Sequence, residues 1–599
     1  VPFFEAAISK LTRSNPNPYD GEAYFQLGLA LRYMGKDAEA YDRFYKAAWS
    51  AAWQDAAYYQ MACICTAGDD LETALSHVER SLVRNYHNMK ARNLKASLLR
   101  KLEKWEACGN LLKENEQIDP LDLGTVYEEA LLQDKIQNSD VPCGKDLLQE
   151  AVRRLRGNFN TAIELAIDKM EAGLYREAAE WLELFISGEM QKGKKEDEIY
   201  PLVYYYVAGC YGKLNQSKAQ ETALRRAASA DSSYCFPHRL EDIGILTGAI
   251  AKSPEDSRAA YYLGNLWYDK KQYGDAISCF ERSAAICDDF ATVHRNLALA
   301  CYNKLHDAKR ARTELEKAFQ LDTTDARVFM ELDQLRKKMG MSKEERLKEL
   351  QNHMELVEIR DDLYLEYATL LNACGRFEEA LQYISRRNFH PWEGGEGKVP
   401  AQYLFSLVET GKKYLRQGDC EAAIKVLKQA AGSYPYNLGE GKLAGAQENN
   451  IYYYLGCAYE GADQPDKAAA CFQKASVGIS EPAGMMYYND QPPEMIFYQG
   501  MALRKLNREK EARSRFHKLL DYGQKHIFDD VKIDYFAVSL PDLQIFDEDL
   551  NRKNEIHCRF LMGLGLLGLG QEKEAGAEFQ KVLALDGMHV GALIHSSWS

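Results

Sequence analysis

The side chains best suited to binding chemistry gather in one short segment of the chain. Residues 386–400 read RRNFHPWEGGEGKVP and hold five of them: His390, Trp392, Glu393, Glu396 and Lys398. A tryptophan beside carboxylates is suited to binding a sugar, because the indole stacks on an apolar ring face while charged groups bind the hydroxyls. The alternative is that Trp392 fixes its own loop to the protein. The segment is compatible with either interpretation.

A second segment repeats part of the first. The tetrapeptide GEGK occurs at Gly395–Lys398 and again at Gly439–Lys442, 44 residues later. Glycine-rich backbone together with Glu440 and Lys442 is suited to a hydroxylated or anionic ligand. The competing interpretation is that these loops cap repeats and pack on a neighbouring domain. A nucleotide-binding loop is excluded, because neither copy is followed by the Ser or Thr that such a loop requires.

A third segment, residues 478–494, has a similar composition and adds Tyr488, Asn489 and Asp490, although Asn-Asp is also a common turn. These residues complete the predicted binding set. The GxGxxG match at residues 563–568 falls inside a helical pattern, so we interpret it as structural. The chain has no HExxH motif, no metal-ligand spacing and no nucleophile signature. No catalytic residue, metal or cofactor is therefore predicted.

These segments interrupt a repeated helical unit, whose clearest copy is Ile451–Ala475. Its first half has large residues and Gly456 at i, i+3, i+4 and i+7, and its second half has an apolar stripe that includes Phe472. Pro465 stands where the second helix would begin. Two short amphipathic helices that each carry a small residue match the tetratricopeptide pattern.

The repeat extends along the chain. Gly28 and Ala62 mark its first copies, 34 residues apart, and about 13 or 14 units follow in all. The sequence therefore predicts an all-α tetratricopeptide-repeat (TPR) superhelical solenoid. After Ala368 the interval rises to between 43 and 63 residues, which divides the array into residues 1–365 and 366–599. We expect the extra residues to lie between helices of ordinary length and to emerge on one edge, as four inserts: 386–400, 436–450, 478–494 and 522–556.

Composition excludes several classes of function. The net charge is −14 with basic residues spread along the chain, so nucleic acid is not an expected partner. No apolar run is long enough to cross a membrane. The 14 cysteines are scattered without a CxxC pair, which indicates reduced thiols and a cytoplasmic location. The chain begins with Val1 and not Met, so we expect it to be a piece of a longer protein.

The inserts also carry a family resemblance. FHPWEGGEGKV, NLGEGK with QEN, MYYNDQPP and KIDYFAVSLPDL with FDEDLN, together with the start NPNPYDGEAYFQLGLALRY, resemble the C-terminal half of large bacterial proteins with a DUF5107 domain. In that family a β-rich region similar to galactose-mutarotase-like sugar-binding domains precedes a tetratricopeptide array. The resemblance implies a carbohydrate-related role for the complete protein. It implies no catalytic residue in this chain.

Two functions from different classes follow. The first is a non-catalytic binding scaffold that contacts another protein or a β-rich domain of its own protein through its concave surface and its inserts. The second is part of a carbohydrate-active enzyme in which the inserts complete a sugar site. Trp392 would stack on the sugar, and the residues that contact its hydroxyls would be Glu393, Glu396, Lys398, Glu440 and Lys442. A third class, a clamp for peptide tails, requires a basic groove, and the acidic composition of the chain gives it little support.

Overall fold

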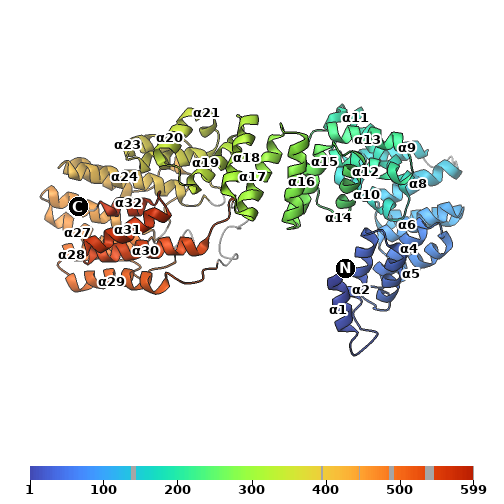
Figure 1. Cartoon of the computed structure of the whole chain (residues 1–599), viewed down its shortest axis with the longest axis horizontal. Coiled ribbons are helices and arrows are strands. Elements are labelled where there is room, and N and C mark those ends of the chain that lie inside the picture. The colour runs from blue at the N-terminus through green and yellow to red at the C-terminus, as the bar shows by residue number, and fades with distance from the viewer. Residues whose placement is uncertain (137–142, 393–394, 444, 485–491, 533–544, 598–599) are drawn as a thin grey trace. The chain divides into compact units, whose positions relative to one another are not determined.

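The computed structural model describes residues 1–136, 143–392, 395–443, 445–484, 492–532 and 545–597. Within these ranges the chain forms helices and short turns, and no strand. The chain divides into two compact units, Val1–Asp288 and Asp289–Ser599 (Figure 1). The prediction of an all-α fold is confirmed. The division predicted between residues 365 and 366 is of a different kind, because it marks a change in the spacing of the repeats. The two units are instead defined by the contacts within each of them.

The first unit contains the following helices, with η for a 3-10 helix: α1 (Pro2–Leu11), α2 (Glu22–Tyr33), α3 (Asp37–Ala47), α4 (Gln54–Ala67), α5 (Leu71–Arg84), α6 (Met89–Lys101), α7 (Trp105–Ile118), α8 (Leu123–Ile136), α9 (Gly144–Leu155), α10 (Phe159–Glu171), α11 (Tyr175–Gln191), η1 (Glu196–Glu198), α12 (Pro201–Lys213), α13 (Ser217–Ser229), α14 (Leu240–Lys252), α15 (Ser257–Asp269) and α16 (Tyr273–Ile286).

The second unit contains these helices: α17 (Ala291–Leu305), α18 (Ala308–Leu321), α19 (Ala326–Lys338), α20 (Lys343–Asn352), α21 (Met354–Val357), α22 (Asp361–Ala373), α23 (Phe377–Ser385), α24 (Lys398–Arg416), α25 (Cys420–Ala431), η2 (Tyr436–Leu438), α26 (Asn449–Gly461), α27 (Pro465–Ala475), α28 (Pro493–Lys505), α29 (Glu509–His526), α30 (Leu550–Gly568), α31 (Glu572–Leu585) and α32 (Val590–Ser596).

Most helices form antiparallel pairs joined by a short turn, as the tetratricopeptide pattern predicts. The described residues contain fourteen packed pairs, from α2 with α3 to α30 with α31, and in every pair but α8 with α9 the connecting turn lies within these residues. In thirteen of them the turn holds one residue with positive φ, for example Gly35, Asp69 and Gly570. A left-handed residue after the last helical turn reverses the chain within a few residues, and glycine adopts it without strain. The number of pairs agrees with the predicted 13 or 14 units.

A glycine of the first helix and a phenylalanine of the second give each well-matched pair its close packing. A Cβ atom added to Gly456 would lie 2.6 Å from Cε1 of Phe472, sixteen positions later. The same contact recurs between Gly28 and Phe44 at 2.6 Å. Each glycine therefore leaves the space that the ring of the partner helix fills. Because the two residues belong to the same helix pair, this packing does not depend on contacts with distant parts of the chain.

Helix α14 was not predicted from the sequence and interrupts the pairing in the first unit. It follows the pair α12 and α13, and packs against α12 and α15. Its apolar residues Leu246 and Ala249 are buried, whereas Gly244 and Gly248 are exposed. Asp242 caps its own first turn by accepting hydrogen bonds from the backbone N–H groups of residues 238 and 239, at 2.9 Å each.

The second unit corrects one expectation about the inserts. Helices α24, α29 and α30 have 19, 18 and 19 residues, so they are longer than the 13 of α26 or α28. Part of the extra length between register marks is therefore helical. The first insert was predicted to end at Pro400, but α24 already begins at Lys398. Proline is accepted within the first helical turn, because its missing N–H would have no intrahelical partner there.

The end of the fourth insert folds back onto the start of the second unit. The side-chain amide of Asn303, on α17, donates to the carbonyl oxygen of Ile545 at 2.9 Å, and its oxygen accepts from the backbone N–H of Asp547 at 2.9 Å. Phe546 is buried edge-on against Tyr302, with ring centroids 4.9 Å apart. This contact joins residues more than two hundred positions apart, and a repeat pattern cannot predict it.

Candidate binding sites

The structure places the residues predicted in the first insert partly at the surface and partly against the repeats. The side chain of His390 is 88% exposed, and its backbone N–H donates to Asp361 at 3.2 Å. Trp392 is half-buried, packs against the hydrophobic core of the second unit and lies directly over Gly395. Lys398 is exposed and Glu396 half-buried. The interpretation in which Trp392 fixes its own loop therefore has a physical basis.

The two GEGK tetrapeptides contact each other. The backbone N–H of Gly397 donates to both carboxylate oxygens of Glu440, at 2.8 and 3.1 Å. Lys442 pairs with Glu448 at 2.5 Å and donates to the carbonyl oxygen of Ala431 at 3.1 Å. These contacts hold adjacent inserts together and occupy the polar groups of Glu440 and Lys442. Four other predicted residues, Glu393, Tyr488, Asn489 and Asp490, lie outside the described residues.

The contacts continue along the inserts and leave apolar side chains exposed. Asn449, near the end of the second insert, donates to the carbonyl oxygen of Val477, the residue before the third insert, at 2.8 Å. Four apolar residues in or next to the second and third inserts are exposed: Tyr436, Leu443, Val477 and Ile479. We call these four residues the insert patch. Tyr436, at 99%, is the most exposed of them.

A second candidate site, which sequence reasoning missed, is a cavity of about 560 Å³ in the first unit. Helices α2, α4, α10 and α12 line it, and all four are the first helices of their pairs, which face the inner side of such an array. Helix α14 and the starts of α11 and α13 complete its wall. We call it the inner cavity. Its volume lies within the range of about 300–1,000 Å³ usual for ligand sites.

Polar contacts between distant repeats close the inner cavity. Arg32, on α2, donates to the side chain of Gln60 at 2.5 Å and to the carbonyl oxygen of Glu171 at 2.6 Å. The hydroxyl of Tyr33 donates to Glu241 on α14 at 2.7 Å. Burial and the neighbouring Glu241 raise the pKa of this hydroxyl above its ordinary value, so it stays protonated and remains a donor.

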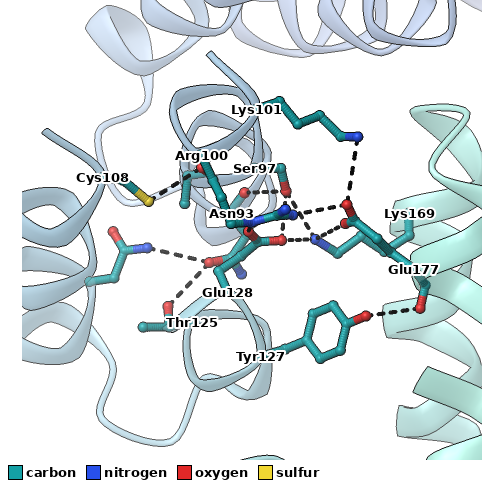
Figure 2. Close-up of polar contacts among 12 residues, drawn as sticks. Asn93, Ser97, Arg100, Lys101, Cys108, Thr125, Tyr127, Glu128, Lys169 and Glu177 are labelled. Atoms are coloured by element: carbon teal, nitrogen blue, oxygen red, sulfur yellow. Dashed lines mark hydrogen bonds and ion pairs between the residues drawn. The ribbon is translucent and has the colours of Figure 1, made fainter. Parts of the chain in front are cut away.

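A buried charge network joins α10 to its neighbouring helices (Figure 2). Lys169 of α10 forms an ion pair with Glu128 of α8 and donates to Ser97 of α6 at 2.9 Å. Arg100 joins Glu128, at 3.0 Å, to Glu177 of α11, at 2.9 Å. Four helices from three repeats are therefore held by one set of charges.

The electrostatics of this network favour its charged form. Burial alone would raise the pKa of Glu128, but Lys169 and Arg100 outweigh burial and hold that pKa at about 2. Glu128 is therefore ionised at neutral pH although its side chain is 0% exposed. A buried charge of this kind requires its partners to be present, which makes the geometry of α10 specific.

The opposite side of α10 carries three carboxylates at i, i+4 and i+7: Glu164, Asp168 and Glu171. Glu164 pairs with Arg239, and Asp168 pairs with Lys90 at 2.7 Å. The carboxylate of Glu171, which lines the inner cavity, forms no hydrogen bond or ion pair within residues 1–136 and 143–288. Burial is the main cause that raises the pKa of Glu171, and Asp168 and Glu241 add to the effect, while the charges of Arg32 and Lys90 oppose it without reversing it.

A larger hollow in the second unit, about 1,380 Å³, lies between α17, the turn before α20, and the starts of α30 and α32. Its cations are already engaged. Lys337 pairs with Glu366 at 3.4 Å, and Arg552 donates to the carbonyl oxygen of Leu585 at 2.7 Å. The inner cavity differs in that it presents a charged group with no partner within its own unit.

One group of the inner cavity, Glu171, belongs to a pattern that is visible in the sequence. The i, i+4, i+7 spacing of Glu164, Asp168 and Glu171 is visible without a structure, because it places like charges on one helix face. Tyr33 and Glu241 belong to no such pattern, because they lie 208 positions apart and meet only through the curvature of the array.

Two features are absent from the described residues. No helix in this part of the chain is long and apolar enough to cross a membrane. No cluster of three or more His, Cys, Asp or Glu side chains in the same residues has a geometry that would hold a metal ion.

No protein-family model matches the chain. Among solved structures it is similar to the TPR domain of P58(IPK), with 13% identity, 76% of this chain and 98% of that chain covered, and a TM-score of 0.19. It is also similar to residues 41-end of MamA from Desulfovibrio magneticus RS-1, with 18% identity, 34% and 96% coverage, and a TM-score of 0.20. A third similar structure is YrrB, described as a TPR protein with an unusual peptide-binding site, with 13% identity, 42% of this chain and 95% of that chain covered, and a TM-score of 0.16. TM-scores of this size carry no conclusion, so the assignment to the tetratricopeptide class rests on the helix pairs of this chain itself.

Proposed function

We propose that this chain is a non-catalytic binding scaffold and that its inner cavity takes a segment of a partner polypeptide. The observation that supports the proposal is the cavity itself, about 560 Å³ on the inner side of the first unit. Its wall combines apolar side chains such as Leu29, Met170 and Ile245 with a small number of polar groups. That combination is typical of a site in which apolar burial supplies affinity and a few polar contacts supply specificity.

Two glycines of α14 allow the proposal to be tested without disturbing the fold. Gly244 and Gly248 line the cavity, and a Cβ atom added to either would meet no atom within 4 Å. We therefore expect Gly248→Trp to occupy part of the cavity and to leave the packing of α14 unchanged. Gly274→Trp is the matched control, because Gly274 is an exposed glycine of α16 that has equally open surroundings and lies outside the cavity.

The assay is binding of the full chain to an array of random synthetic decapeptides. We expect a subset of peptides to bind the wild-type chain and the Gly274→Trp variant, and to lose binding to Gly248→Trp. Circular dichroism confirms that both variants keep their helix content. An array with no peptide sensitive to Gly248→Trp would show that the cavity does not bind polypeptide.

We propose the insert patch as a second contact surface, for a β-rich domain of the kind that precedes the tetratricopeptide array in the DUF5107 proteins. Exposed apolar side chains on adjacent inserts support docking of a protein partner. Co-purification of this chain with such a domain, and its loss in a Tyr436→Ser and Ile479→Ser double variant, tests the proposal. Unchanged co-purification in the double variant would exclude the patch as the contact.

The alternative of a sugar site at the inserts stays a prediction. The exposed His390 and Lys398 remain accessible for it. Thermal-shift screening with oligosaccharides, compared among wild type, Trp392→Ala and Glu396→Gln, tests it directly. A cytoplasmic location also stays a proposal, supported by the free thiols of all 14 cysteines.

A further inference from the structure

The unpaired carboxylate of Glu171 identifies the chemistry that the inner cavity recognises. We infer that the cavity binds a lysine or arginine side chain of the partner polypeptide, with its charged end on Glu171 and its aliphatic part along the apolar wall. The inference rests on the proposed function, because it names the residue class that the same cavity would take.

The carboxylates of α10 supply the first argument. Three like charges on one helix face repel one another, and an ion pair with a cation from another element offsets this repulsion. Glu164 has Arg239 from the loop before α14, and Asp168 has Lys90 from α6. Glu171, the third, faces the cavity and has no such partner within the described residues of its unit. A cation from outside would complete the set.

Arg32 is the cavity cation that acts most strongly on Glu171 and lowers the pKa of its carboxyl, but it forms no hydrogen bond or ion pair with that carboxylate. The guanidinium of Arg32 donates to Gln60 and to the backbone carbonyl of residue 171, and lies 3.9 Å from Asp37. Lys213 is exposed at the edge of the cavity, where water solvates it. Glu241 adds a second carboxylate, which accepts a hydrogen bond from Tyr33. An anionic ligand group would meet two carboxylates here, whereas a cation would be stabilised by both.

The apolar and aromatic part of the wall favours a long basic side chain over a small cation. Leu29, Ile167 and Met170 offer surface for the methylene groups of lysine or arginine, which lose contact with water when buried. Tyr33 and Tyr175 add ring faces suited to a cation. A free polyamine shares the charge but has no peptide backbone through which neighbouring residues would add contacts.

The test starts from the decapeptides whose binding Gly248→Trp abolishes. We expect them to contain lysine or arginine, and we expect replacement of one such residue, lysine by norleucine or arginine by citrulline, to weaken binding roughly 10- to 100-fold, as for loss of a charge-assisted hydrogen bond. Glu171→Gln should cause the same loss. Combined with the altered peptide it should cause no further loss, because both changes remove one contact.

Glu164→Gln is the matched control, since Glu164 belongs to the same set of carboxylates but pairs with Arg239. Its affinity for the peptide should equal that of the wild type. Spermidine should compete only weakly with the peptide.

Three results would overturn the inference. They are cavity-binding peptides without a basic residue, an affinity unchanged by Glu171→Gln, and displacement by spermidine at the concentration at which the peptide itself binds. The first two leave the scaffold function in place. Absence of any peptide sensitive to Gly248→Trp would instead refute the function, and the inference with it.

Discussion

Replacing Lys169 with methionine tests whether the buried charge network fixes the first unit. Methionine keeps most of the side-chain volume but removes the ammonium group that pairs with Glu128 and hydrogen-bonds to Ser97. The variant leaves the Glu128 carboxylate buried with Arg100 as its remaining cation. A buried charge that loses a partner destabilises the folded state strongly.

The magnitude follows from the pKa of Glu128. A carboxyl whose pKa falls from 4.5 to about 2 is stabilised in its charged form. At about 1.36 kcal/mol per pKa unit, the difference corresponds to about 3 kcal/mol. Because Arg100 stays in place, we expect Lys169→Met to lower the local free energy of unfolding by about 2 to 3 kcal/mol.

Hydrogen exchange measured by mass spectrometry is the appropriate assay, because a repeat array opens segment by segment and not in one transition. Peptides from α8 and α10 should exchange faster in Lys169→Met, whereas peptides from the second unit should not change. Lys104→Met is the control, since Lys104 forms an exposed pair with Glu72 at 3.2 Å and such pairs contribute under about 1 kcal/mol.

The network also predicts a pH dependence with a defined sign. The folded pKa of Glu128 is depressed, so its contribution is complete above pH 4.5 and is lost as pH falls towards about 2. Exchange of α8 in the wild type should therefore accelerate, after correction for intrinsic rates, over that window. Equal protection of α8 in wild type and Lys169→Met at neutral pH would refute the account of the network.

Three further predictions concern other parts of the chain. Gly456→Val should destabilise α26 by about 1 to 3 kcal/mol, because its Cβ would lie 2.6 Å from the Phe472 ring. Gly576→Val is the control, because a Cβ there has open surroundings, and it should cost less than about 1 kcal/mol. Thermal unfolding of both variants measures the difference. Burial lowers the pKa of His595 to about 3, so below pH 6.5 the unfolded chain binds a proton that the folded chain does not. The protection of α32 against hydrogen exchange should therefore decline between pH 6.5 and 3. Protection that stays constant over this range would contradict the prediction. Cys143 is the exposed cysteine among those described and should react first with iodoacetamide, as peptide mass mapping would detect.

The repeat scaffold was predictable because its determinants are local. The contact of Gly456 with Phe472 spans sixteen positions and recurs between the same two places of other units. Each unit packs on its neighbours, so periodicity alone specifies the helix pairs. Helix α14 departs from the period and for that reason has no counterpart in the pattern.

The sites were harder to predict for a physical reason. Sequence reasoning favoured the inserts, because unusual residues are visible there, and the structure shows that Glu440 and Lys442 are engaged in contacts within and between the inserts. The inner cavity depends on the curvature that brings Tyr33 against Glu241. Curvature accumulates from small rotations between repeats, which no single residue specifies.

Hydrogen-exchange footprinting of the full chain with a decapeptide sensitive to Gly248→Trp tests the central claim most directly. We predict slower exchange in the second half of α2, at the end of α10 and in α14, and no change in α26 or α28. Protection confined to the inserts of the second unit, or to the outer helices of the first, would contradict the assignment of the inner cavity as the binding site.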